Sequence, residues 1–126
     1  MAPPLGAAVA ACPPRDSRVT ERASPARHEV PEVDVAALEA ARAADRALAA
    51  AQVVGADRWA RYLAPLPDRL RDDPIAGLHA VARRARSAYG PKDSIRDALP
   101  PDATEPLLRA VDRLLKVLAR HELEAR

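Results

Sequence analysis

The sequence predicts an all-helical protein: a small helical bundle of three long helices plus one or two short ones, behind a disordered N-terminal tail. Ala accounts for 30 of the 126 residues, and apolar residues recur at the three- and four-residue spacing of amphipathic helices. No segment alternates apolar and polar residues as a half-buried strand would. A chain of this length forms one domain, which excludes large barrels and folds with two cores.

Residues 1–31 are expected to form the disordered tail, and residues 32–126 the helical bundle domain. Six prolines interrupt the tail, and no helical or strand period survives them. Val9, Ala10, Ala11 and Cys12 fit the small-residue box that precedes a lipid-modified cysteine in bacterial export signals. No Lys or Arg precedes Cys12, and prolines interrupt the segment that should be apolar, so the flanks disfavour an export signal.

Two helices are expected in the first half of the domain. The first spans residues 32–54, where Asp34 is placed to cap the first turn. Its strongest stripe is mainly alanine, which would let a neighbouring helix approach closely. The stripe consists of Leu38, Ala41, Ala44, Leu48 and Ala51. A short helix over residues 58–64 should end at Pro65 and Pro67.

The strongest start and stop signals delimit a helix over residues 74–89. Asp73 can accept the free amide hydrogens of the first turn, and Pro74 needs no partner at the first helical position. Gly90 follows the last turn and is typical of a helix end. A shorter helical segment is expected over residues 94–99.

The last helix is expected over residues 104–124, with Pro106 tolerated because it falls in the first turn. Its leucines and valines recur at helical spacing and give it one strongly apolar face. With few aromatic residues in the chain, the core must be built from Leu, Val and Ala around a few larger anchors. The expected core anchors are Trp59, Tyr62, Leu78, Tyr89 and Val111.

Charge and cysteine content exclude several classes of protein. The chain has 20 Lys plus Arg and 18 Asp plus Glu, a balance that does not by itself predict nucleic acid or an anionic membrane. The residue usage is that of a high-GC bacterial genome, so arginine abundance alone says little about function. One cysteine forms no internal disulfide, and no apolar run is long enough to cross a membrane. We therefore expect a cytoplasmic protein that makes no membrane contact.

No pattern in the sequence predicts catalysis, a metal or a cofactor. His121 and Glu122 begin a zinc-binding pair, but Arg126 stands where the second histidine would be. The serines lie outside any nucleophile-elbow context, and the four glycines form no phosphate-binding loop. We expect no catalytic, cofactor-binding or metal-binding residues, and the sequence favours a protein that is not an enzyme.

A basic stretch in the second half of the chain is a candidate contact for anions or nucleic acid. Its guanidinium groups offer planar forks of donors that match phosphates and carboxylates. A solvated helix face in an arginine-rich protein has the same pattern. A helix-turn-helix interpretation fits poorly, because the second helix over residues 94–99 is under two turns long. The candidate contacts are His79, Arg83, Arg84, Arg86, Lys92 and Arg96.

A second basic line lies on the last helix, opposite its leucines. It consists of Arg109, Arg113, Lys116 and Arg120. Nearby acids balance these charges, so this side is expected to be an ordinary solvated wall of the bundle.

The leading hypothesis is a non-enzymatic helical protein that acts through protein contact, as an accessory or regulatory subunit or as a homodimer. The apolar sides of the first and last long helices are wide, and any surplus not buried in the monomer marks a contact surface. An alternative is a nucleic-acid-associated regulator that uses Arg83, Arg84, Arg86 and Arg96. A further alternative is an all-helical enzyme or binder of a small anionic metabolite.

Overall fold

A computed structural model describes residues 25–125 of the chain. Within these residues the secondary structure is helical and contains no strand, which confirms the all-helical prediction. The long helices are α3 (Pro31–Val54), α6 (Ile75–Arg86) and α8 (Pro101–Ala125), and the short ones are α4 (Asp57–Leu63), α5 (Leu66–Asp72) and α7 (Ile95–Ala98). Two 3-10 turns, η1 (Arg27–Glu29) and η2 (Ser87–Tyr89), flank α3 and α6.

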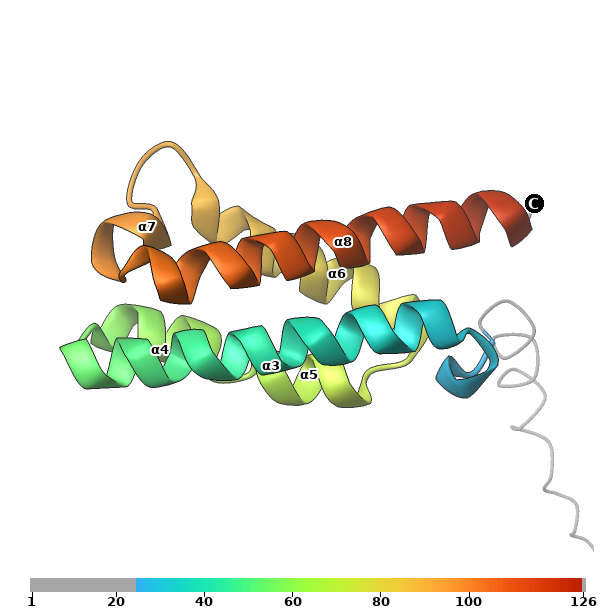
Figure 1. The fold of residues 1–126 in the computed structure, drawn as a ribbon, viewed down its shortest axis with the longest axis horizontal. Coiled ribbons are helices and arrows are strands. Elements are labelled where there is room, and N and C mark those ends of the chain that lie inside the picture. Colours follow the sequence, from blue (N-terminus) through green and yellow to red (C-terminus); the bar gives the residue numbers. More distant parts are fainter. Residues whose placement is uncertain (1–24, 126) are drawn as a thin grey trace, which may run out of the picture.

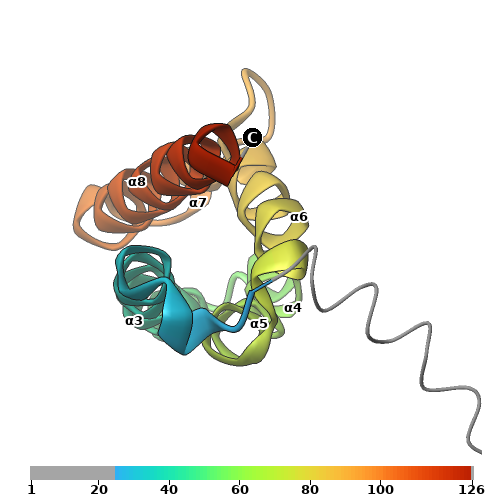
Figure 2. The same cartoon turned by 90° about the vertical axis from the view of Figure 1, so that its right-hand side faces the viewer.

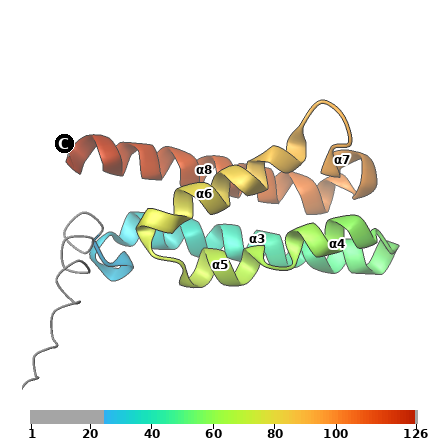
Figure 3. The same ribbon diagram turned by 180° about the vertical axis from the view of Figure 1, so that it is seen from behind.

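The helices pack as an antiparallel bundle (Figure 1). The chain runs along α3, returns along α4 and α5, passes forward along α6, and returns along α8 after the short α7. The end-on view in Figure 2 shows α3 beside α8 on one flank and beside α5 on another. The view from behind in Figure 3 shows α6 crossing between α5 and α8, which closes the bundle.

The helix α5 is the element that sequence patterns do not predict. Pro65 and Pro67 predict the end of a helix followed by a loop, whereas in the structure Pro67 lies in the first turn of α5. A proline is compatible with that turn, because its missing amide hydrogen would have no partner there. Leu66 and Leu70 are fully buried and hold α5 against the core. The proline pair therefore separates two helices instead of a helix and a loop.

The capping roles predicted for Asp34 and Asp73 are wrong. The helix α3 begins at Pro31, so Asp34 lies inside its first turn, where its carboxylate accepts a 2.8 Å hydrogen bond from Nε of Arg27. Asp73 ends α5, and its carboxylate accepts from Nε of Arg69 at 3.2 Å. In both cases an arginine side chain, and not a free backbone amide, is the partner of the carboxylate.

The C-terminal end of α3 is as predicted, whereas the end of α6 and the start of α8 differ from the predicted ones. The helix α3 closes at Gly55, whose φ of 74° is left-handed and lets the next amide reach back into the last turn. The helix α6 ends at Arg86 and continues as η2, and Gly90 is extended with φ −71°. Because α8 begins at Pro101, Pro106 lies beyond the first turn and inside the helix.

One apolar core lies between α3 and the other helices. Among the expected anchors, Trp59, Leu78, Tyr89 and Val111 are buried, whereas Tyr62 is half-buried with its hydroxyl donating to a carbonyl of α6. The face that α3 buries is alanine apart from Val33. The leucines at 38 and 48, which the sequence places on the buried stripe of α3, are only half-buried.

Arg27 fastens the start of the described chain to the bundle. Its Nη1 donates to the carbonyl oxygens of Leu70, Arg71 and Asp73 at 2.8, 2.7 and 3.1 Å, at the C-terminal end of α5. The first described element, η1, and its contacts with α5 thus lie before the boundary expected at residue 32. The tail prediction for residues 1–24, with the box at 9–12, lies outside the described residues.

Candidate functional site

The structure uses part of the predicted basic stretch for internal contacts. Arg86 donates from Nε to the carboxylate of Asp112 at 3.0 Å, which links α6 to α8. The guanidinium of Arg84 lies over the ring of Tyr62, with 4.5 Å between Cζ and the ring centroid. Arg83 and Lys92 are exposed and His79 is half-buried, and within residues 25–125 none of these three forms an ion pair.

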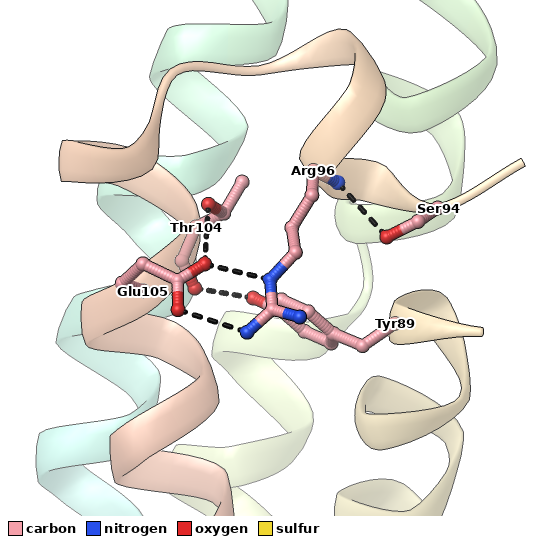
Figure 4. A network of polar contacts seen from close by, with 5 residues as sticks. All are labelled: Tyr89, Ser94, Arg96, Thr104 and Glu105. Atoms are coloured by element: carbon pink, nitrogen blue, oxygen red, sulfur yellow. Dashed lines mark hydrogen bonds and ion pairs between the residues drawn. The ribbon is translucent and has the colours of Figure 1, made fainter. Parts of the chain in front are cut away.

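Arg96 belongs to a polar network that fastens α7 and η2 to α8 (Figure 4). Its guanidinium donates two hydrogen bonds to Glu105, at 2.8 and 2.9 Å, and this pairing lowers the pKa of the Glu105 carboxyl. The hydroxyl of Tyr89 donates to the carbonyl of Thr104, and burial raises the pKa of Tyr89. Ser94 caps α7 by accepting from the Arg96 amide at 3.1 Å. The network therefore joins elements of the same chain, and it engages the half-exposed guanidinium of Arg96 in an intramolecular ion pair.

A different set of cationic side chains gathers along the groove between α3 and α8. Its central hollow has a volume of about 350 Å³ and is open to solvent. Four arginines, two from each helix, surround a floor of small apolar residues. The lining residues are Glu39, Arg42, Ala43, Arg46, Pro106, Arg109, Ala110 and Arg113. The two helices thus contribute equally to the cationic rim.

Two further hollows adjoin the central one and share arginines with it. One, of about 420 Å³, lies toward the C-terminal end of α8 and is lined by Glu32, Arg109, Asp112, Arg113, Lys116, Val117 and Arg120. The other, of about 330 Å³, lies toward the start of α8 and is lined by Arg46, Ala49, Ala50, Pro100, Asp102 and Ala103. We call the three hollows together the α3–α8 groove.

The acids of the α3–α8 groove are mostly paired already. Glu39 and Glu32 of α3 lie 3.8 and 3.1 Å from Arg113 and Arg120 of α8, and Asp112 is bound by an arginine of α6. Asp102 is the remaining acid of the lining.

The unpaired charges of the α3–α8 groove are mainly positive. Within the described residues, Arg42, Arg46, Arg109 and Lys116 form no ion pair. These four cations exceed the single unpaired acid, so the groove has a local positive field that the balanced composition of the chain conceals.

The sequence indicates the α8 half of this site. Its basic line predicts a solvated wall, and the four side chains are exposed, but the pattern on one helix does not show that they lie beside cations of α3. Arg42 and Arg46 lie four residues apart on α3, beside its alanine stripe, and share one side of the helix. This four-residue spacing is the feature of the sequence that indicates a cationic side of α3. Which helix their side faces depends on the antiparallel packing of α3 with α8, which no local pattern states.

The α3–α8 groove has the chemistry of an anion-binding surface. Guanidinium groups offer carboxylates and phosphates charge and directed hydrogen bonds. The residues that line its three hollows include no Ser, Cys, His or Tyr that could act as a nucleophile or proton carrier. Among the described residues, no three of His, Cys, Asp and Glu cluster in a way that could hold a metal ion.

Two findings bear on the class of the protein. In the part of the chain that the structure describes, no helix combines the length and the apolar character needed to cross a membrane. Comparisons with protein-family models, with curated proteins and with solved structures found no match to this chain.

Proposed function

We propose that the protein is a non-enzymatic helical binding protein that acts through contact with another protein, as an accessory or regulatory subunit, and that the α3–α8 groove is its contact surface. The observation that carries the proposal is the convergence of unpaired cations from two helices on one open groove. Like charges held side by side repel one another, and an anionic partner replaces that repulsion with attraction. The single cysteine is compatible with the reducing cytoplasm as the place of action.

The same charges disfavour a homodimer formed through this groove. A twofold dimer places the same surface patch of both subunits in contact. Cationic rims would then face cationic rims, which costs binding energy. The charge pattern therefore favours a different protein as the partner.

The test is capture of partners by two charge-reversal variants of the full chain. Arg42→Glu with Arg109→Glu changes the α3–α8 groove. Arg61→Glu with Arg83→Glu changes the charge equally at exposed positions of α4 and α6. We expect at least one protein that the unchanged chain and the α4/α6 variant retain and that the groove variant loses. Identical sets of captured proteins for all three chains would refute the proposal.

A second candidate function is the binding of a small anionic metabolite. The central hollow, at about 350 Å³, has the size of a small-molecule pocket, and four arginines surround it. A metabolite of this kind should raise the midpoint of thermal unfolding, and Arg42→Glu with Arg109→Glu should abolish the rise. The continuation of the groove on both sides of the hollow favours an elongated partner over a compact ligand.

The nucleic-acid hypothesis loses support from the same contacts. Of its four arginines, Arg86 and Arg96 form ion pairs and Arg84 lies over an aromatic ring. Only Arg83 is left without such a contact among the described residues, and one arginine is a small basis for binding phosphates.

A further inference from the structure

We propose that the partner segment is an acidic helix that lies lengthwise along the α3–α8 groove, with carboxylates at its centre and apolar residues at both of its ends. The inference rests on the proposed function and specifies the chemistry of the partner. Its three supports are the length of the groove, the position of the unpaired cations, and the position of the exposed apolar side chains.

The groove has the length and spacing that suit a helix. Its lining on α3 reaches from Glu32 to Ala50, an 18-residue span that corresponds to about 27 Å of helix. Residues of α3 and α8 line it at intervals of three and four, the spacing at which helix ridges fit into grooves. The floor is largely alanine, which lets a partner backbone come close. A helix of about five turns therefore fills the groove.

Three of the four unpaired cations border the central hollow, and the fourth, Lys116, lines the hollow toward the C-terminal end of α8. Arg42 and Arg46 of α3 stand on one rim, and Arg109 and Lys116 of α8 stand on the other. Carboxylates on one face of a helix, at intervals of three and four residues, reach both rims together. The partner helix should therefore carry its Asp or Glu residues in its central turns.

Exposed apolar side chains mark the two ends. Val35 is 52% exposed and lies four residues before Glu39, so helical spacing puts it on the same side of α3 as the groove. Val53 is 85% exposed and lies four residues after Ala49, on that side at the far end. Leu123 of α8 is 68% exposed, one turn beyond Arg120. These residues are three of the four large apolar side chains that are exposed among the described residues.

Along its length, the groove is apolar at one end, cationic in its central part and apolar at the other end. This order of surface types distinguishes between classes of partner. Duplex nucleic acid presents phosphates along its whole length and keeps the apolar faces of its bases stacked inside, so it offers little for the apolar ends of the groove. A small metabolite reaches only one hollow. A second copy of this chain brings like charges together. An amphipathic helix with apolar anchors about 27 Å apart complements all three parts of the groove.

The experiment uses two synthetic peptides of equal composition, each about 20 residues long and fluorescently labelled. In the first, the face toward the groove carries Glu in the central turns and Leu in the first and last turns. In the second, Leu and Glu exchange places. Because both peptides carry the same charge, unspecific attraction to the cations affects them equally. Binding to the full chain is measured by fluorescence anisotropy at low and physiological salt.

We expect the first peptide to bind about fivefold or more tightly than the second, since only the first matches both charges and apolar ends. Arg42→Glu with Arg109→Glu should weaken its binding by about tenfold or more, and the exposed control pair Arg61→Glu with Arg83→Glu by less than about twofold. Val35→Ser with Val53→Ser should lower the affinity for the first peptide and leave the second unchanged. Arg42→Gln with Arg109→Gln, which adds no negative charge, gives a second version of the groove test if the reversal variant unfolds.

Several outcomes would overturn the inference. Equal binding of both peptides would contradict the proposed order of acidic and apolar residues in the partner helix. Displacement of the first peptide by duplex DNA at lower concentration than by unlabelled peptide would point to nucleic acid, and a dimer that the groove variant loses in sedimentation would point to a second copy. If partner capture depends on the groove but both peptides bind alike, only this inference fails. If the reversal changes neither capture nor peptide binding, the proposed function fails with it.

Discussion

Arg96 and Glu105 show how a single pair couples charge to stability. Two hydrogen bonds join the guanidinium to the carboxylate, and they hold the pKa of Glu105 below its usual range. A carboxyl group whose pKa is lower in the folded than in the unfolded chain stabilises the fold while it is ionised. This contribution is complete above the unfolded pKa of about 4.3 and is lost as the pH falls through the folded pKa.

Glu105→Gln should therefore lower stability at neutral pH and have a smaller effect in acid. We expect the variant to unfold at a lower urea concentration than the unchanged chain at pH 7, with the difference shrinking below about pH 4. Glu122→Gln is the matched control, because Glu122 is exposed and forms no ion pair within the described residues. A Glu105 effect of equal size at both pH values would contradict the assignment.

At the scale of elements, the buried face of α3 is unusual because it consists almost entirely of alanine. Ala40, Ala44 and Ala47 are fully buried, and apart from Val33 the larger side chains of the core come from elements other than α3. Alanine is the strongest helix former, so α3 gains helical stability while it gives up apolar burial. Close packing of α8 against α3 depends on the small size of these residues.

Ala44→Leu should consequently destabilise the bundle through overpacking. We expect a loss of about 1–3 kcal/mol, since the added methylenes have no free volume to enter. Ala49→Leu is the matched control on the same helix, because Ala49 is exposed, and its cost should stay within about 0.5 kcal/mol. Urea unfolding of both variants measures the two values. Equal losses would show that the alanine face is loosely packed.

The long helices could be predicted from the sequence, and so could the short α4 and α7, expected over residues 58–64 and 94–99, whereas the short α5 could not. The stretches that form α3, α6 and α8 carry enough apolar residues at helical spacing to outweigh errors at their ends. The helix α5 is one of the short elements, and a proline pair signals the end of one helix as readily as the start of the next. The two predicted caps are wrong because the helices begin elsewhere: Asp34 lies inside the first turn of α3, and Pro74 holds the position that precedes α6.

At the scale of the whole molecule, Arg27 joins three segments that are separate in sequence. It links η1 to the first turn of α3 and to the last carbonyls of α5, and its side chain is 11% exposed. Its Nη1 alone donates to the three carbonyls while its Nε donates to Asp34, so the planar group contacts α5 and α3 at once, and its Nη2 is buried without a hydrogen-bond partner among the described residues. Loss of this side chain leaves part-buried carbonyls without a donor.

Arg27→Gln should destabilise the entire bundle and not one end of it. We expect a loss of about 1–2 kcal/mol, the cost of leaving part-buried acceptors without a donor. Because α3, α5 and the other helices share one core, the fluorescence of Trp59 in α4 and the far-ultraviolet circular dichroism should shift together. Arg69→Gln, at a half-exposed ion pair, is the control and should cost less than about 1 kcal/mol. Separate transitions for the two signals would mean that η1 supports only its own neighbourhood.

The α3–α8 groove could be predicted from the sequence only in part. Each of its charges was visible, and the spacing of Arg42 with Arg46 placed them on one side of a helix. Arg42 and Arg46 lie close to Arg109 because of which sides of α3 and α8 face each other. The packing of the whole core determines those sides. A balanced total charge hides such a local excess, because acids elsewhere in the fold cancel it only in the sum.

The alanine face of α3 has a mechanical consequence. Large side chains that interdigitate usually fix the axial register of two packed helices. The methyl side chains of alanine are too short to interdigitate in this way. The register of α3 against α8 is then set mainly by the buried leucines and valines of α8, and the exposed ion pairs of Arg113 with Glu39 and of Arg120 with Glu32 add a small contribution at two levels of the seam. A partner bound along that seam would contact both helices and resist the axial displacement of one helix against the other.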